Sequence, residues 1–216
     1  MSKLRLKKSK SVYKVLKPFL DLLVSILVIL LGIPPLILIA ILIKFSSRGP
    51  IFYLHKRIGK NKKYFYCIKF RTMHPEAEDI LENLLESNSE LKKEYEKTHK
   101  IKNDPRITRI GKFLRKTSLD ELPQFINVLR MEMSITGPRP IVDDEVSKYG
   151  ESFLKVFSIK PGITGLWQVS GRNNLSYKKR VFLDSHYVDN YNFLMDLRIL
   201  IRTFGVLFFP MDRGAY

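Results

Sequence analysis

The chain has 216 residues, of which 45% are hydrophobic and 27% are charged, and its single cysteine excludes an internal disulfide. This length and apolar content allow one domain with appendages and exclude a disordered chain. The net charge of +17 is concentrated in residues 1–71, which hold 16 Lys and Arg but only one acid, Asp21. Because this charge flanks an apolar run, it favours anionic membrane lipids over nucleic acid as a partner.

The first predicted element is a hydrophobic helix at about residues 19–43, which follows a basic arm. Between residues 22 and 43 only Ser25, Gly32, Pro34 and Pro35 interrupt the aliphatic run. A straight helix of this length spans about 33 Å, enough to cross a bilayer core. The paired prolines remove two backbone donors, and the basic residues at both ends prefer the cytosol. These features favour a re-entrant helix that enters and leaves on one face, with a proline-kinked span as the alternative.

A short β-hairpin and a charged helix are expected next. The pattern predicts a strand at residues 51–53, a turn at 57–61 and a return strand at 64–71. On the return strand, Lys69 and Arg71 share one face, where they serve either as surface charges or as ligands for an anion. Residues 75–100 have helical spacing of their apolar side chains and predict a helix without assigned chemistry.

Residues 106–116 predict a basic amphipathic helix, which Thr108 can cap. Its apolar stripe of Ile110, Phe113 and Leu114 lies among basic side chains that include Arg115. This pattern favours a helix in the plane of the lipid headgroups. A helix that packs one face on a protein core explains the same pattern.

Two adjacent carboxylates, Asp120 and Glu121, follow this helix within Thr117–Gln124. Ser118 and Glu121 have the spacing of a capping box, and acids in a first helical turn suit the helix dipole. The alternative hypothesis is that Asp120 is a nucleophile. The two interpretations are compatible, because one helix end can hold both acids in place.

The second half of the chain adds candidate ligands for phosphate and nucleotide. Pro138 and Pro140 fix the backbone on both sides of Arg139, which suits a guanidinium presented to a phosphate or a planar base. In residues 160–173, three glycines allow backbone donors to approach an anion, and Gln168 and Arg172 are polar neighbours suited to a nucleotide.

Two further segments have open interpretations. The acidic run at residues 143–145 either binds a divalent cation or begins a solvated helix. Residues 192–209 are apolar, but Asp196, Arg198 and Arg202 interrupt them, so an interfacial or core helix is favoured over a membrane span.

Together these motifs resemble the bacterial sugar transferases, which are monotopic polyprenyl-phosphate hexose-1-phosphate transferases. The resemblance runs from about residue 16 to the C-terminus. It is carried by K-F-R-T-M at 69–73, T-S-L-D-E-L-P-Q at 117–124, G-P-R-P at 137–140 and K-P-G-I-T-G-L-W-Q-V-S-G-R-N at 160–173. The run at 102–109 and the G-A-Y ending look most like the catalytic domain of undecaprenyl-phosphate galactose phosphotransferase.

The resemblance implies a two-step reaction in which a carboxylate attacks a UDP-sugar, UMP leaves, and undecaprenyl phosphate takes the hexose-1-phosphate. It implies Asp120 as the nucleophile, with Glu121 as its catalytic partner and both residues at a Mg²⁺ site. The resemblance also associates the segment at 138–140, which contains Arg139, and the segment that contains Gln168 and Arg172 with nucleotide and phosphate binding. Together with Lys69, Arg71 and Arg115, the predicted substrate-binding residues are Pro138, Arg139, Pro140, Gln168 and Arg172. Galactose and glucose are the favoured hexoses, and a homodimer is possible.

The expected fold is α+β and mostly helical, with interfacial helices around a small domain that contains the β-hairpin. We expect residues 1–45 to form the basic arm and re-entrant helix, and residues 46–216 to form the transferase domain at the cytoplasmic face of the bacterial inner membrane. Two alternative functions fit the same sequence. One is a metal-dependent glycosyltransferase that uses residues 143–145 and releases UDP, and the other is a non-catalytic adaptor at the membrane surface.

Overall fold

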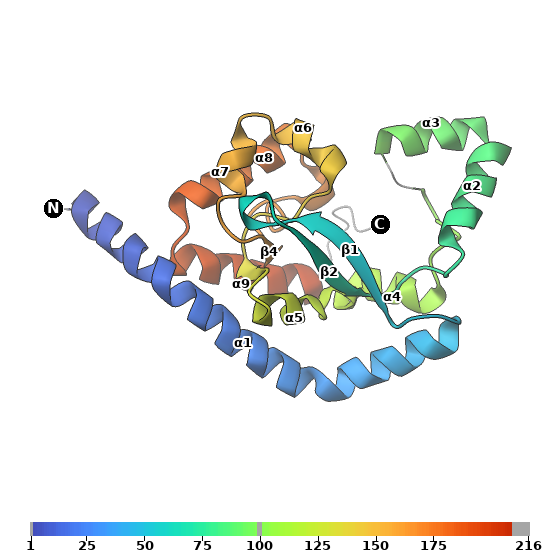
Figure 1. The fold of residues 1–216 in the computed structure, drawn as a ribbon, viewed down its shortest axis with the longest axis horizontal. Coiled ribbons are helices and arrows are strands. Elements are labelled where there is room, and N and C mark those ends of the chain that lie inside the picture. The colour runs from blue at the N-terminus through green and yellow to red at the C-terminus, as the bar shows by residue number, and fades with distance from the viewer. Residues whose placement is uncertain (1, 99–100, 209–216) are drawn as a thin grey trace. The chain divides into compact units, whose positions relative to one another are not determined.

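A computed structural model describes residues 2–98 and 101–208, and its fold is α+β and mostly helical, as predicted. Figure 1 shows the elements in chain order. They are α1 (Ser2–Ser46), β1 (Phe52–Ile58), η1 (Lys60–Lys62), β2 (Tyr64–Phe70), α2 (Ala77–Ser87), α3 (Ser89–Thr98), α4 (Arg109–Thr117), η2 (Leu119–Glu121), α5 (Gln124–Leu129), β3 (Ser134–Thr136), η3 (Asp143–Glu145), α6 (Val146–Tyr149), α7 (Ser152–Val156), β4 (Gly162–Thr164), η4 (Arg172–Asn174), α8 (Tyr177–Asn190) and α9 (Phe193–Phe208).

The chain divides into two compact units. Of the described residues, the first unit contains 2–33, 54–69 and 123–208, and the second contains 34–53, 70–98 and 101–122. Each unit has buried apolar clusters of its own. The division crosses α1 at its paired prolines. The domain boundary expected near residue 45 stays a prediction.

Helix α1 contains the hydrophobic segment. From Val12 to Ser46 it is long and apolar enough to cross a membrane, and only 11% of its most apolar window is buried. The helical assignment continues through Pro34 and Pro35, so the paired prolines leave no non-helical gap. The predicted membrane helix is therefore confirmed in length and composition, and its re-entrant course stays a prediction.

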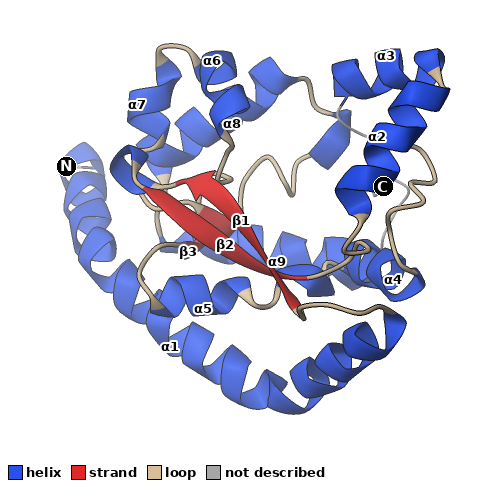
Figure 2. Cartoon of the chain, turned by 45° about the vertical axis from the view of Figure 1, so that its right-hand side comes forward, coloured by secondary structure: helices blue, strands red, loops and turns tan. Residues whose placement is uncertain are grey.

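The predicted hairpin is confirmed, with a longer first strand than expected. Strands β1 and β2 form a two-stranded sheet, and the turn between them is the 3₁₀ segment η1. Asn61 adopts a left-handed conformation there, at φ 55°. In both ribbon views α6, α7 and α8 lie on one side of this hairpin, and α5 and α9 lie on the other (Figures 1 and 2).

A second sheet, which the sequence did not predict, pairs β3 with β4 in parallel. Its glycines serve backbone packing. A Cβ at Gly162 would lie 2.1 Å from the Gly137 nitrogen, and one at Gly165 would lie 2.3 Å from the Gly137 oxygen. The N–H groups of Gly137 and Gly162 donate to the carbonyls of Thr164 and Pro138. Glycine is required because the backbones approach closely, so these two donors do not face an anion.

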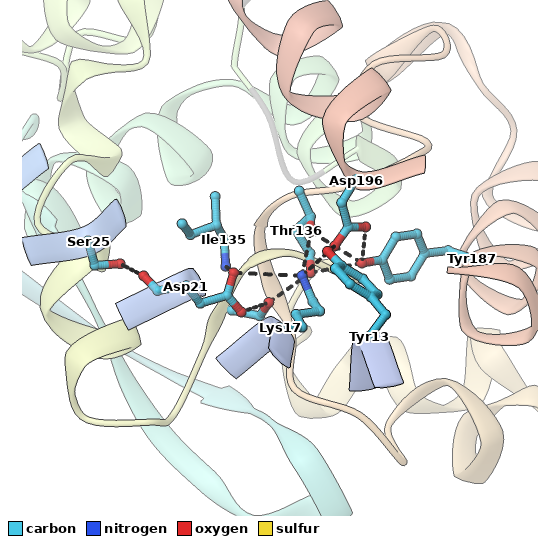
Figure 3. Close-up of polar contacts among 9 residues, drawn as sticks. Tyr13, Lys17, Asp21, Ser25, Ile135, Thr136, Tyr187 and Asp196 are labelled. Atoms are coloured by element: carbon cyan, nitrogen blue, oxygen red, sulfur yellow. Dashed lines mark hydrogen bonds and ion pairs between the residues drawn. The ribbon is translucent and has the colours of Figure 1, made fainter. Parts of the chain in front are cut away.

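Within the first unit, a buried polar network joins the N-terminal part of α1 to β3, α8 and α9 (Figure 3). Lys17 Nζ donates to Asp196 Oδ2 and to Thr136 Oγ1, each at 2.6 Å. Tyr13 and Tyr187 donate their hydroxyls to Asp196, at 2.6 and 2.7 Å. Lys17 is therefore not part of a free basic arm, because α1 brings its ammonium group to a buried carboxylate.

Asp21 extends this network by one helical turn. Its Oδ2 accepts a hydrogen bond from Ser134 Oγ at 2.6 Å, and its Oδ1 lies 3.7 Å from Lys17 Nζ. Ser25 Oγ donates to the Asp21 carbonyl at 2.6 Å. The network involves both β3, through Ser134 and Thr136, and α9, through Asp196.

In the second unit, helices α2 and α3 replace the single helix predicted at residues 75–100. Asn88 lies between them in an extended conformation. Its Oδ1 accepts hydrogen bonds from the backbone N–H groups of Glu90 and Leu91, at 3.1 and 3.0 Å. The helix therefore restarts at Ser89, because the Asn88 side chain satisfies donors of the new first turn.

Helix α4 packs on a core, which was the alternative interpretation of its apolar stripe. Leu114 is fully buried and Ile110 is half-buried in a cluster with Ile39, Ile43 and Phe70. Phe113, by contrast, is 53% exposed. The predicted cap is confirmed, because Thr108 Oγ1 accepts a hydrogen bond from the Gly111 N–H at 2.9 Å. Placement of α4 in the headgroup plane stays a prediction.

Candidate functional site

Asp120 and Glu121 lie together in η2, the 3₁₀ turn between α4 and α5. Both side chains are half-buried, and both take part in interactions within the protein. Adjacent acids in one tight turn are held to a short stretch of backbone. This arrangement presents two carboxylates close together and partly accessible to a ligand.

The predicted capping box at these acids is wrong. Ser118 adopts a left-handed conformation at φ 56° and makes no side-chain cap hydrogen bond. It ends α4 instead, with its N–H directed to the carbonyls of Leu114 and Arg115. A residue in the left-handed conformation terminates the preceding helix, whereas an N-cap residue has an extended backbone. The acids are therefore not capping-box ligands.

Arg115, on the last turn of α4, is the basic residue associated with this pair. Its Nε donates to Thr72 Oγ1 at 2.9 Å. Burial lowers the pKa of Arg115, and the negative charge of Asp120 acts in the opposite direction. The Arg115 guanidinium therefore places a positive charge near the Asp120 carboxylate, and the two opposite charges attract each other.

The contact that positions Arg115 depends on a close approach of α4 to Thr72. The Thr108 N–H donates to the Thr72 carbonyl at 3.0 Å. A Cβ on Gly111 would lie only 1.9 Å from that same carbonyl oxygen. The absence of a side chain at Gly111 therefore lets the helix lie directly against the backbone at Thr72, one turn before Arg115.

The donor set of Asp120 and Glu121 suits Mg²⁺. This cation is commonly held by one or two carboxylates, with water and substrate phosphate completing its shell. Among residues 2–98 and 101–208, no group of three or more His, Cys, Asp or Glu side chains could hold a metal. The described chain thus offers a carboxylate pair suited to a shared metal–substrate site rather than a metal cage built from protein alone.

Arg71 has an evident structural task. Its guanidinium donates to the carbonyls of Ser47 and Arg48, at 2.8 and 3.0 Å, and to Ser47 Oγ at 3.0 Å. The residue is 6% exposed. These bonds fasten the turn that follows α1, and they occupy donors that the sequence interpretation assigned to substrate.

Lys69 belongs to a basic cluster in the first unit. His55 is the centre of this cluster, and the charges of Arg57, Lys69 and Arg139 act on it. Burial, followed by these three charges, lowers the pKa of His55 to about 4. His55 is therefore neutral at pH 7, and the surrounding cations create a positive potential that favours an anion.

Trp167 lies beside two guanidinium groups. The Arg180 and Arg139 Cζ atoms lie 4.8 and 6.0 Å from the centre of its ring. Two buried polar atoms here, Trp167 Nε1 and Gln168 Oε1, have no hydrogen-bond partner within the described protein. Such atoms are ordinarily satisfied, so they are candidates to bind a polar planar ligand.

The proline segment and Arg172 complete the predicted substrate-binding residues. Pro138 and Pro140 are buried and Arg139 between them is half-buried, so the expected rigid presentation of Arg139 is consistent with the fold. Arg172 is half-buried, has a φ of 50°, and donates its backbone N–H to the Trp167 carbonyl at 3.3 Å.

The acidic run at residues 143–145 forms η3, and two of its side chains have structural partners. Asp143 accepts a hydrogen bond from the Tyr64 hydroxyl at 2.6 Å. Glu145 Oε2 accepts from the Val142 N–H at 3.2 Å and lies 3.6 Å from Arg57 Nη1. These contacts favour the interpretation of residues 143–145 as the start of a helix over a divalent cation site.

The predicted site residues thus fall into two groups. Asp120, Glu121, Arg71 and Arg115 belong to the second unit. The residues in the first unit are Lys69, Pro138, Arg139, Pro140, Gln168 and Arg172. The sequence interpretation missed His55, Arg57 and Arg180, because a scattered histidine and arginines in a turn and a helix carry no motif of their own.

Comparison with known proteins shows the family. The model of the family described as bacterial sugar transferase matches residues 12–210. An uncharacterized sugar transferase of Haemophilus influenzae is 48% identical over 94% of this chain and 42% of its own length. The exopolysaccharide production protein ExoY of Rhizobium meliloti is 44% identical over 91% of this chain and 86% of its own length. The undecaprenyl-phosphate galactose phosphotransferase of Salmonella typhimurium is 44% identical over 93% of this chain and 42% of its own length.

The chain therefore belongs to the bacterial sugar transferase family, and the predicted enzyme class, a phosphoglycosyl transferase, is confirmed. It spans about two fifths of the length of the Haemophilus and Salmonella relatives and most of the length of ExoY.

Proposed function

We propose that this protein transfers hexose-1-phosphate from a UDP-sugar to undecaprenyl phosphate and releases UMP, as a membrane step in the assembly of a surface polysaccharide. The observation that carries the proposal is the pair Asp120 and Glu121 in one turn, with Arg115 near Asp120. The names of relatives, which include a galactose phosphotransferase and exopolysaccharide production proteins, support the same reaction class.

In the proposed first step, a carboxylate oxygen of Asp120 forms a bond to the β-phosphorus of the UDP-sugar. The bond from that phosphorus to the bridging oxygen breaks, and UMP leaves with its electron pair. A phosphate oxygen of undecaprenyl phosphate then attacks the same phosphorus and releases the Asp120 carboxylate. Covalent catalysis of this kind divides one difficult displacement into two easier ones.

Charge neutralisation is the main requirement of this chemistry, because an anion attacks a dianionic diphosphate. A bound Mg²⁺ would supply part of that neutralisation, with the Asp120 and Glu121 oxygens as its protein ligands. Arg115 would stabilise the charge at the reacting phosphoryl group. The basic side chains around His55 and the unsatisfied atoms of Trp167 and Gln168 also support binding of an anionic, planar nucleotide.

The membrane helix fits a reaction between a soluble nucleotide and a long-chain lipid. We propose that residues 1–45 anchor the protein and that residues 46–216 work at the cytoplasmic face of the inner membrane. The apolar surface of α1 supports this assignment, because its large side chains are widely exposed. Galactose and glucose are the sugars to test first.

The decisive experiment mixes detergent-purified protein with UDP-galactose or UDP-glucose and Mg²⁺ and omits the lipid acceptor. We expect about one UMP per active enzyme and a hexose-phosphate adduct on the peptide that contains Asp120. Asp120→Asn should abolish both products. Asp143→Asn is the matched control and should retain them, because Asp143 is bound to a tyrosine in η3. Absence of UMP and adduct with every UDP-sugar tried would reject the covalent mechanism.

The competing reaction is direct sugar transfer with release of UDP, with residues 143–145 as metal ligands. The described residues hold no cluster of three such ligands, and Asp143 and Glu145 have structural partners. The leaving nucleotide separates the two reactions. UDP among the products, lost in Asp143→Asn and kept in Asp120→Asn, would favour this alternative. Membership of an enzyme family disfavours the third hypothesis, a non-catalytic adaptor.

A further inference from the structure

A lysine-lined pocket lies beside the N-terminal part of α1, and none of the residues discussed for catalysis lines it. Its volume is about 120 Å³. Lys14 of α1, Lys60 of η1 and Lys160 before β4 contribute three ammonium groups to its lining. The same pocket is lined by apolar side chains, including Met131, Met133 and Ile159. It thus combines positive charge with apolar walls.

The lysines that line this pocket outnumber its carboxylates. Asp21 is the one carboxylate in the lining, and it is already bound to Ser134 Oγ and paired with Lys17. Within the described chain, no ion pair is recorded for Lys14, Lys60 or Lys160. Burial lowers the pKa of Lys160 and the charge of Lys60 lowers it further, whereas the charge of Asp21 raises it by a smaller amount. Like charges that converge in this way are stabilised by a bound anion.

The position of the pocket on α1 indicates where that anion comes from. The apolar segment that could cross a membrane begins at Val12, so Lys14 and Pro18 of the lining lie in its first turns. Val15 and Phe19, between and beside them, are 65% and 67% exposed. Headgroups lie at the end of a membrane helix, and acyl chains lie along its exposed apolar face.

We propose that this pocket binds the phosphate of an anionic glycerophospholipid, with an acyl chain along the exposed apolar face of α1. The bound lipid would neutralise Lys60 and Lys160 and fix the depth of the helix end. The proposal rests on entry of α1 into a membrane and is independent of the transfer reaction. An anionic diacyl lipid fits better than a free phosphate, because apolar surface continues from the pocket along the helix.

The test is native mass spectrometry of the full chain, purified in a non-ionic detergent and mixed with phosphatidylglycerol or phosphatidylcholine. We expect one phosphatidylglycerol per chain to be retained in preference to phosphatidylcholine. Lys60→Gln with Lys160→Gln should weaken retention about 30-fold, the loss expected for two lysines at an anionic lipid. The double change to Arg keeps the charge and should retain the lipid.

The matched control neutralises Lys63 and Lys178, two exposed lysines outside the pocket lining, and should change retention less than about threefold. Equal loss in both double variants, or equal retention of the two lipids, would overturn the proposal. Full displacement by inorganic phosphate would show a simple anion site and also overturn it. Preferential displacement by undecaprenyl phosphate would assign the pocket to the acceptor instead. UMP release in detergent, without phosphatidylglycerol, should be unchanged in the lysine variants, so a failed transfer reaction is distinguished from a failed lipid site.

Discussion

The ammonium group of Lys17 lies 2.6 Å from Asp196 Oδ2, in a pair whose side chains are only 11% and 6% exposed. The two residues are 179 positions apart in sequence. The hydroxyls of Tyr13 and Tyr187 also donate to Asp196, so the pair is surrounded by hydrogen bonds (Figure 3). This contact holds an apolar helix to α9 through a charge that is removed from water.

Lys17→Met should therefore destabilise the protein by about 3–5 kcal/mol, because it leaves a buried carboxylate without its cation. The matched control is Lys155→Met. Lys155 Nζ also lies 2.6 Å from a carboxylate, that of Asp189, but these side chains are 46% and 53% exposed. The control should cost less than about 1 kcal/mol. Denaturant unfolding in detergent measures both, and similar losses would show that burial does not set the strength of the Lys17 pair.

Gly162→Ala should disrupt the parallel β3–β4 sheet. The added Cβ would lie 2.1 Å from the Gly137 nitrogen and 2.5 Å from the Thr164 oxygen, and backbone cannot move aside as a flexible side chain can. We expect a loss of about 1–3 kcal/mol in unfolding free energy, as in overpacked cores. Gly205→Ala, in α9 with nothing within 4 Å of the new Cβ, should be neutral or slightly stabilising. A tolerated Gly162→Ala would contradict the close approach.

Arg71→Gln separates a structural role from substrate binding. The change removes several hydrogen bonds to Ser47 and Arg48, so unfolding free energy should fall by about 2–4 kcal/mol. If the structural contacts account for this residue, KM for the UDP-sugar should change little in the protein that stays folded. Arg130→Gln, at an exposed position, is the control for the loss of one positive charge. Normal stability with a strongly raised KM would instead assign Arg71 to the substrate.

The lowered pKa of His55 predicts a pH dependence of stability. The folded-state value is about 4, below the unfolded value near 6.5, so the unfolded chain binds the extra proton first. This contribution to stability is complete above about pH 6.5 and is lost as the pH falls toward 4. In the His55→Gln variant, the free energy of unfolding should therefore change less with pH between about pH 4 and about pH 6.5. If the unfolding free energy of the variant depends on pH as strongly as that of the natural protein, another group is responsible for the pH dependence.

The same histidine should report an anion bound at its basic cluster. UDP placed near Arg57, Lys69 and Arg139 would offset their charge and raise the pKa of His55 by about one unit. Carbon-labelled histidine NMR follows this change directly. His186, which is exposed and stacked on Phe182, should keep its resonance position. If the pKa of His55 does not change at saturating UDP, the basic cluster does not bind the diphosphate.

Several features were determined by the sequence alone. The apolar run at residues 22–43 predicted a membrane-length helix, because a continuous aliphatic stretch is a local signal. The hairpin and the Thr108 cap were likewise local, since turn residues and a cap act within a few positions. The motif set also identified the family, which the comparisons confirmed.

Tertiary structure decided the features that depend on distant partners. The predicted capping box at Ser118 was wrong, because the spacing of serine and glutamate does not reveal that Ser118 adopts a left-handed conformation after α4. The glycines near residue 162 pack against residue 137, and only the parallel pairing of β3 with β4 creates that approach. His55 acquires its environment from Arg139, 84 positions away in the numbered chain. In the sequence, Lys17 looked like part of a basic arm. Folding brings it to Asp196, because the partners of a charged group are the residues near it in the folded structure and not its neighbours in sequence.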